Sequence, residues 1–201
     1  MPAIKHAATK NPGDKGYASE WNADHVIDDN SITLAKLTAG VRSKVSEVDV
    51  ASNTNAVDFT GLDVNTDRFY ELYGTLKNND ASTATYYLFV NADYTITNYY
   101  REYVVFTGGS ITMGRVNDNA LQYLETGKLG TLVAVIMRDP DGYFRFHMHG
   151  TRYLGSAFDM LFMGCVKTAS ITNITELRVA SNVASGIGAG SKLTLFRGRS
   201  K

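Results

Sequence analysis

The stretch LVAVIMRDPDGYFRFHMH, residues 132–149, decides the fold class. An apolar run ends at Arg138, and Asp139–Pro140–Asp141–Gly142 has the composition of a tight turn. After the turn, apolar and polar residues alternate, which is the pattern of a strand with one buried face. Phe144, Phe146 and Met148 share one face, and Arg145, His147 and His149 share the other. We therefore predict a β-hairpin whose return strand is half-buried.

The same period of two recurs along the rest of the chain. Over residues 69–77 the odd positions carry Phe, Glu, Tyr, Thr and Lys, and the even positions carry Tyr, Leu, Gly and Leu. Further strands are expected at 84–91, 99–106, 158–167, 175–181 and 191–197. After residue 50 there is no capped helical period of ten residues. About ten short strands joined by turns predict an all-β fold over residues 50–201, an antiparallel β-sandwich of jelly-roll type.

Composition narrows the class of protein. The chain has 201 residues, and its 20 Lys and Arg balance its 20 Asp and Glu, so net charge gives no support to a nucleic-acid partner. Its apolar runs are far shorter than the ~20 residues that a bilayer requires, so membrane insertion is not expected. We expect no signal peptide, because residues 1–15 lack an apolar core segment. The single cysteine, Cys165, excludes an intramolecular disulfide.

The first fifty residues differ from the remainder. They contain only two aromatic residues, Tyr17 and Trp21, whereas all nine phenylalanines lie later in the chain. Aromatic side chains supply much of the buried area of a core. We therefore predict that residues 1–30 form an extended arm without a core of its own.

A short helical linker is predicted over residues 31–49. Leu34, Leu37, Val41 and Val48 have a heptad-like spacing, and Ser31 is available as the N-cap. This segment has three interpretations: a helix packed on the domain, a brief self-association segment, or an irregular linker.

Candidate binding residues cluster in residues 91–101. Tyr94, Asn98, Tyr99 and Arg101 combine aromatic rings with an amide and a charge. Rings pack against the apolar faces of sugars while polar groups bind hydroxyls, and tyrosine and arginine are also enriched at protein interfaces. The alternative is that these tyrosines are half-buried in the sandwich with their hydroxyls in water.

Catalytic and metal-binding chemistry is sparse. His147 and His149 point the same way on a strand and are weak metal candidates, because two ligands are too few for a tight site. A threefold axis could bring six imidazoles together, and the alternative is a pair of solvent-facing or cross-strand histidines. Cys165 lies in an apolar strand and is expected to be structural. No cofactor is expected, and an enzyme acting on surface polymers is the less favoured alternative.

Three segments resemble proteins of tailed-phage particles. Residues 18–27, with Ala18–Ser19–Glu20–Trp21–Asn22 and His25, resemble the N-terminal regions of phage fibre and minor virion proteins. Residues 29–37 are similar to the Gly-Ser-Ile-Thr-x-Ala-Lys-Leu unit of tail-fibre shafts, with Asn30 in place of glycine. The ending, with Val179–Ala180–Ser181 and residues 187–197, resembles the closing strand of phage β-sandwich head domains.

This resemblance implies a non-enzymatic structural protein of the virion, usually trimeric and assembled in the host cytoplasm. The arm would dock on other virion proteins of the tail, neck or capsid through Trp21, Asn22 and His25. Leu34, Leu37 and Val41 would support trimer formation. The sandwich would present Tyr94, Asn98, Tyr99 and Arg101 to a host-surface glycan or protein. The alternative within this class is a capsid decoration or head-fibre protein that braces or coats the shell.

Overall fold

The structure is a computed structural model that describes residues 42–154 and 157–198. The predicted arm over residues 1–30 lies outside the described residues. So do the predicted docking residues Trp21, Asn22 and His25 and the predicted trimer contacts Leu34, Leu37 and Val41. Their proposed roles stay predictions.

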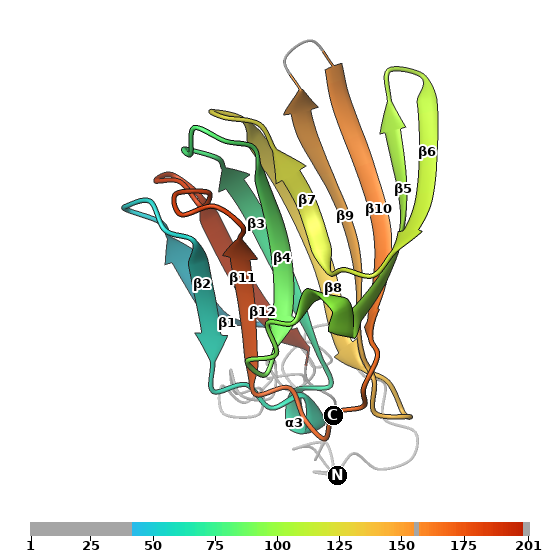
Figure 1. Ribbon diagram of the computed structural model, residues 1–201. Coiled ribbons are helices and arrows are strands. Elements are labelled where there is room, and N and C mark those ends of the chain that lie inside the picture. Colours follow the sequence, from blue (N-terminus) through green and yellow to red (C-terminus); the bar gives the residue numbers. More distant parts are fainter. Residues whose placement is uncertain (1–41, 155–156, 199–201) are drawn as a thin grey trace, which may run out of the picture. The chain divides into compact units, whose positions relative to one another are not determined.

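Two antiparallel sheets of unequal size form the domain (Figure 1). In spatial order, the large sheet contains β1 (Ser43–Asp49), β12 (Lys192–Gly198), β3 (Phe69–Lys77), β8 (Leu129–Arg138), β9 (Phe144–Leu154), β10 (Ala157–Lys167), β5 (Tyr99–Thr107) and β6 (Ser110–Val116). The small sheet contains β2 (Ala56–Thr60), β11 (Glu176–Ser181), β4 (Ala84–Val90) and β7 (Ala120–Leu124). One helical turn, α3 (Val64–Asp67), and a 3₁₀ turn at Ile96–Asn98 complete the described elements. The predicted all-β antiparallel sandwich is confirmed.

The core lies between the facing sides of the two sheets. Alternate residues of each strand point inward, as the period of two predicts. The largest fully buried side chains include Tyr70, Tyr86, Tyr99, Phe144 and Phe146. The central hairpin forms as predicted: the Gly142 amide donates to the Asp139 carbonyl oxygen at 2.9 Å, and the Tyr143 amide donates to the Asp139 carboxylate at 2.8 Å.

The helix prediction is wrong for residues 43–49. These residues form β1, which pairs with β12 along the edge of the large sheet. A β-bulge between Lys44 and Ser46 lets Val45 and Val48, three residues apart, both pack against the core. Val48, the last position of the predicted heptad-like pattern, is therefore a core-facing residue of a strand and not of a helix.

The large sheet extends beyond the small one. Edge strand β7 contacts β8 and β9, and strands β10, β5 and β6 continue past it (Figure 1). The inner face of β5 and β6 is therefore only partly covered. The outer face of the same strands has no covering layer among the described residues.

Candidate functional site

Tyr99 does not belong to a receptor-binding surface, contrary to the prediction. Its side chain is buried, and its ring packs edge-on against Phe89 and Phe144. The hydroxyl donates to the Asp93 carbonyl oxygen at 2.9 Å and accepts from the Val90 amide at 3.2 Å. Burial raises the pKa of Tyr99. The residue joins the two sheets instead of facing solvent.

The other three predicted contacts are each bound to a carboxylate of this chain. Tyr94 is 44% exposed, and its hydroxyl donates to Glu176 at 3.1 Å while its ring packs on Phe89. Asn98 donates to the Asp93 carboxylate at 3.0 and 3.1 Å. Arg101 lies on the inner face of β5, where it makes a two-point ion pair with Asp118. Of the four predicted contacts Tyr94 alone is exposed, and the Arg178 guanidinium lies 4.6 Å from the centre of its ring.

The charged side chain of Asp93 holds the segment between β4 and β5 in place. Its carboxylate accepts from Asn98 and from the Lys167 ammonium at 2.9 Å, and Lys167 is nearly buried. Burial by itself would raise the pKa of Asp93. The hydrogen bonds from Lys167 and Asn98 outweigh that effect and hold the pKa below its ordinary value of 3.8. The segment is a structural corner of the sandwich.

The candidate functional surface is instead the outer face of β9, β10, β5 and β6. Strand pairing arranges its side chains in rows that cross the four strands. One row runs through His149, Phe162, Val104 and Met113, and the next through Thr151, Met160, Phe106 and Ile111. Phe158 and Tyr153 face each other beyond these rows. We call the seven large apolar side chains of these rows the apolar face: Phe106, Ile111, Met113, Tyr153, Phe158, Met160 and Phe162.

The apolar face is strongly exposed. The exposed fraction of its side chains runs from 40% at Phe106 to 74% at Met113. Phe106 and Phe162 pack edge to face with ring centres 6.0 Å apart, so the rings form one continuous surface. Contiguous apolar surface of this kind marks an interaction site.

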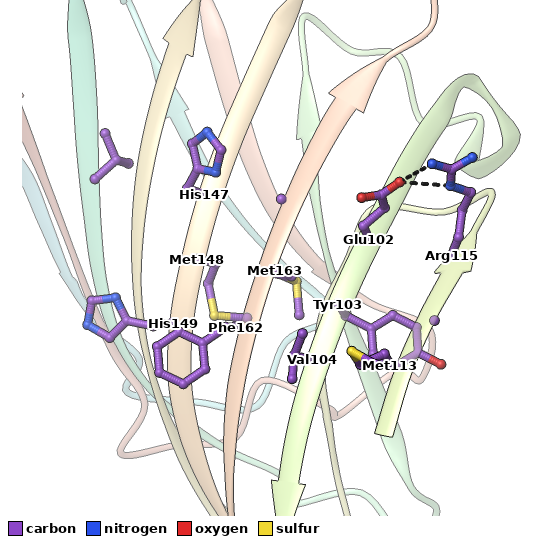
Figure 2. A pocket seen from close by; sticks show the side chains of 13 residues that line it. Glu102, Tyr103, Val104, Met113, Arg115, His147, Met148, His149, Phe162 and Met163 are labelled. Atoms are coloured by element: carbon purple, nitrogen blue, oxygen red, sulfur yellow. Dashed lines mark hydrogen bonds and ion pairs between the residues drawn. The ribbon is translucent and has the colours of Figure 1, made fainter. Parts of the chain in front are cut away.

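A row of polar residues borders the apolar face. It contains His147, Gly164, Glu102 and Arg115 in neighbouring strands. Figure 2 shows Glu102 accepting from Arg115, whose Nε lies 2.8 Å from the carboxylate oxygen. This bond raises the pKa of Arg115. Gly164 adds no side chain between His147 and Glu102, and a shallow hollow of about 790 Å³ opens across this row and the adjacent His149–Met113 row.

The two histidines face the same side of β9, as predicted, but they have different neighbours. The His149 ring stacks on Phe162 at 6.4 Å between centres, whereas His147 lies beside Gly164. Residues 42–154 and 157–198 contain no cluster of three or more His, Cys, Asp or Glu residues that could hold a metal ion. The pair by itself offers too few ligands for a tight site.

Cys165 is buried in β10, on the inner side of the sheet. Burial raises the pKa of its thiol to about 12. The nucleophilic thiolate is therefore scarce at neutral pH. This agrees with the structural role expected from the sequence.

One feature of the sequence indicates the apolar face: in β10 both the odd and the even positions are mostly apolar. Strand β10 is apolar on both sides: Leu161 and Met163 point inward, and Phe158, Met160 and Phe162 point outward. Strands with two apolar faces are typical of sheets that are covered on both sides. The arrangement suits a protein–protein contact.

No helix within the described ranges is long and apolar enough to cross a membrane. Comparisons with known proteins give little further information. Neither a protein-family model nor a curated protein matches the sequence.

Two solved structures are similar at a low level. One is a protein of unknown function from Shewanella oneidensis MR-1, with 14% identity, a TM-score of 0.26, and coverage of 81% of this chain and 77% of that one. The other is Scytalido-glutamic peptidase with a peptide-based transition-state analogue, with 10% identity, a TM-score of 0.24, and coverage of 74% and 65%. Both TM-scores are too low to carry an argument about function.

Proposed function

We propose that this chain is a non-enzymatic structural component of a virus particle, of the tail-fibre or spike type. Its sandwich associates with further copies of itself through the apolar face, and the remaining surface serves host attachment. The sequence resemblance of residues 18–37 supports the virion role. The observation that carries the assembly role is the apolar face, which is too large for a surface left permanently in water.

The occupant of the apolar face is a second copy of the chain. A fully exposed side chain of this size presents roughly 200 Å², so the seven exposed fractions leave on the order of 700 Å² open. A stable protein–protein interface buries about 800 Å² on each partner. The apolar face and its border are thus the size of one such contact.

The neighbouring edge and charges favour self-association. Strand β6 is the open edge of the large sheet beside the apolar face, and Arg115 is its only charged residue. Open edges are usually protected by charges, because they pair readily with other chains. Arg115 is already paired with Glu102, and the chain has a formal net charge of 0. Copies therefore meet without a net repulsion.

The test of assembly adds charge to the apolar face. The double variant Ile111→Lys/Met113→Lys places two ammonium groups on it, and Ser52→Lys/Thr60→Lys adds the same charge at exposed positions elsewhere. Light scattering should give the wild type and the control at least twice the 22.0 kDa mass of the chain, and the face variant a monomer. A monomeric wild type, or an oligomer that survives in the face variant, would contradict the proposal.

The test of the virion role removes the arm. A chain lacking residues 1–30 should keep its oligomeric mass but no longer sediment with particles when it is expressed during their assembly. Continued incorporation would exclude the arm as the docking element. An intact chain found on the shell and not on the tail would favour the alternative, a capsid decoration or head-fibre protein.

A further inference from the structure

A cleft lies on the inner side of the large sheet, beside the open edge of the small one. It has a volume of about 460 Å³ and is lined by β5, β6 and β10 on one side and by β7 with the loop before it on the other. Small-molecule clefts in proteins occupy about 300–1,000 Å³. The cleft is separate from the apolar face, which occupies the opposite side of the same strands.

The floor of the cleft is polar at both ends and apolar in the middle. Arg101 stands at one end of β5 and Thr107 at the other, about 20 Å apart at the rise of a β-strand. Between them lie Tyr103 and Val105, with Leu161 of β10 directly beside Val105. An elongated ligand with apolar patches and polar ends would match this strip.

Each polar end is held by an ion pair. Arg101 donates to Asp118 at 2.5 and 3.0 Å, and its guanidinium lies 4.7 Å from the centre of the Tyr103 ring. At the other end Arg152 donates twice to one oxygen of Asp159, the strand neighbour of Thr107, at 2.6 and 2.8 Å. The positive and negative charges balance at both ends. A neutral ligand therefore fits better than an anion or a cation.

Gln122 supplies unused hydrogen-bonding capacity at the wall of the cleft. Its side chain is 3% exposed, and neither its amide nitrogen nor its amide oxygen has a hydrogen-bond partner among the described residues. The second oxygen of Asp159, in the neighbouring ion pair, is also without a partner there. Buried polar groups are almost always paired in folded proteins. Three of the five buried side-chain atoms without a partner in the described part of the chain belong to Gln122, which lines the cleft, and to Asp159, the strand neighbour of the lining residue Thr107, and they indicate a ligand that completes them.

The chemistry of the lining narrows the class of ligand. The Gln122 amide offers two donors and an acceptor, which matches hydroxyl groups that both donate and accept. Tyr123, at the rim, is 43% exposed, and Tyr87 and Tyr103 add two further rings. Aromatic rings pack against the apolar C–H faces of sugars. We propose that this inter-sheet cleft binds a neutral oligosaccharide, with Gln122 turned toward its hydroxyls and Tyr123 stacked on a ring.

This proposal deepens the host-attachment part of the proposed function and rests on it for its biological role. Binding itself is tested on the full chain in solution. Neutral and anionic oligosaccharides on an array are used as probes, and the strongest neutral one is then titrated calorimetrically. Neutral probes should bind and anionic ones should not. Binding confined to anionic probes, or to none, would overturn the proposal, whereas a failure of assembly or particle docking would leave this result unchanged.

Two variants and one matched control locate the site. Tyr123→Ala and Gln122→Met should each weaken binding of the titrated probe by about tenfold, the effect of losing one good contact. Tyr100→Ala removes a tyrosine that is 37% exposed but lies on the opposite face of β5, outside the cleft, and it should leave the affinity unchanged. Unchanged binding in both cleft variants, or an equal loss in Tyr100→Ala, would refute the location.

Discussion

Replacing Gln122 with methionine is expected to stabilise the protein while it weakens ligand binding. Methionine has nearly the same length and volume, so it fills the space where the amide lies against Gly130 on β8. The substitution removes an amide whose nitrogen and oxygen are both buried without a partner among the described residues. It therefore removes a cost of folding without opening a cavity.

The size of the effect follows from those two atoms. An unpaired buried polar group costs about 1–3 kcal/mol, and methionine has no such group. We expect the free energy of unfolding to rise by about 2 kcal/mol. In a domain of this size that corresponds to an increase in Tm of about 4–8 °C.

Thermal and urea unfolding of the full chain measure this change. The matched control is Asn78→Leu, because Asn78 is an equally buried amide whose nitrogen donates to Ser82 and Leu124 at 2.8 and 2.9 Å. In that variant the free energy of unfolding should fall by about 2–3 kcal/mol, because the buried partners of Asn78 are left without a hydrogen bond. A Gln122→Met protein that melts below the wild type would refute the reasoning, because the amide would then have a stabilising partner.

Two further predictions concern buried charges. Asp159→Ala leaves Arg152, whose side chain is 3% exposed, without its partner. The free energy of unfolding, measured with urea, should fall by about 3–5 kcal/mol. In the double variant Arg152→Met/Asp159→Leu it should come close to the wild-type value. If the double variant is as unstable as Asp159→Ala, the loss does not come from an uncompensated charge. Because the pKa of Asp93 is lowered, its carboxylate stabilises the fold above the ordinary pKa of 3.8, and this contribution disappears as the pH falls below that value. Asp93→Asn should therefore melt below the wild type by about 1–2 kcal/mol at neutral pH, and the difference should shrink near pH 3; a constant difference would contradict this assignment.

The strongly alternating strands could be predicted from the sequence because each residue's face follows from its position. The predicted limits 69–77 coincide with β3, and the hairpin of β8 and β9 turns at Asp139–Gly142 as expected. Strand β7 was missed because it has five residues, and a register shift interrupts its pairing with β4. Strand β6 was missed because Ser, Thr and Gly dilute its apolar pattern.

The functional surfaces were harder to predict because they depend on which strands lack a covering layer. Tyr99 and Tyr100 are adjacent tyrosines on opposite faces of β5, and the sequence does not say which face is buried. The cleft depends on the unequal widths of the two sheets, which is a tertiary property. Its most informative residue, Gln122, is distinguished only by the partners that it lacks.

The two apolar sides of β10 have a consequence for the life of the newly made chain. A sandwich that folds before it meets its copies exposes Phe158, Met160 and Phe162 to solvent, next to the edge of β6, which pairs with no further strand among the described residues. Proteins that expose apolar surface beside an unpaired strand edge aggregate as their concentration rises. In the assembly proposed above, further copies of the chain cover this surface and so limit its aggregation.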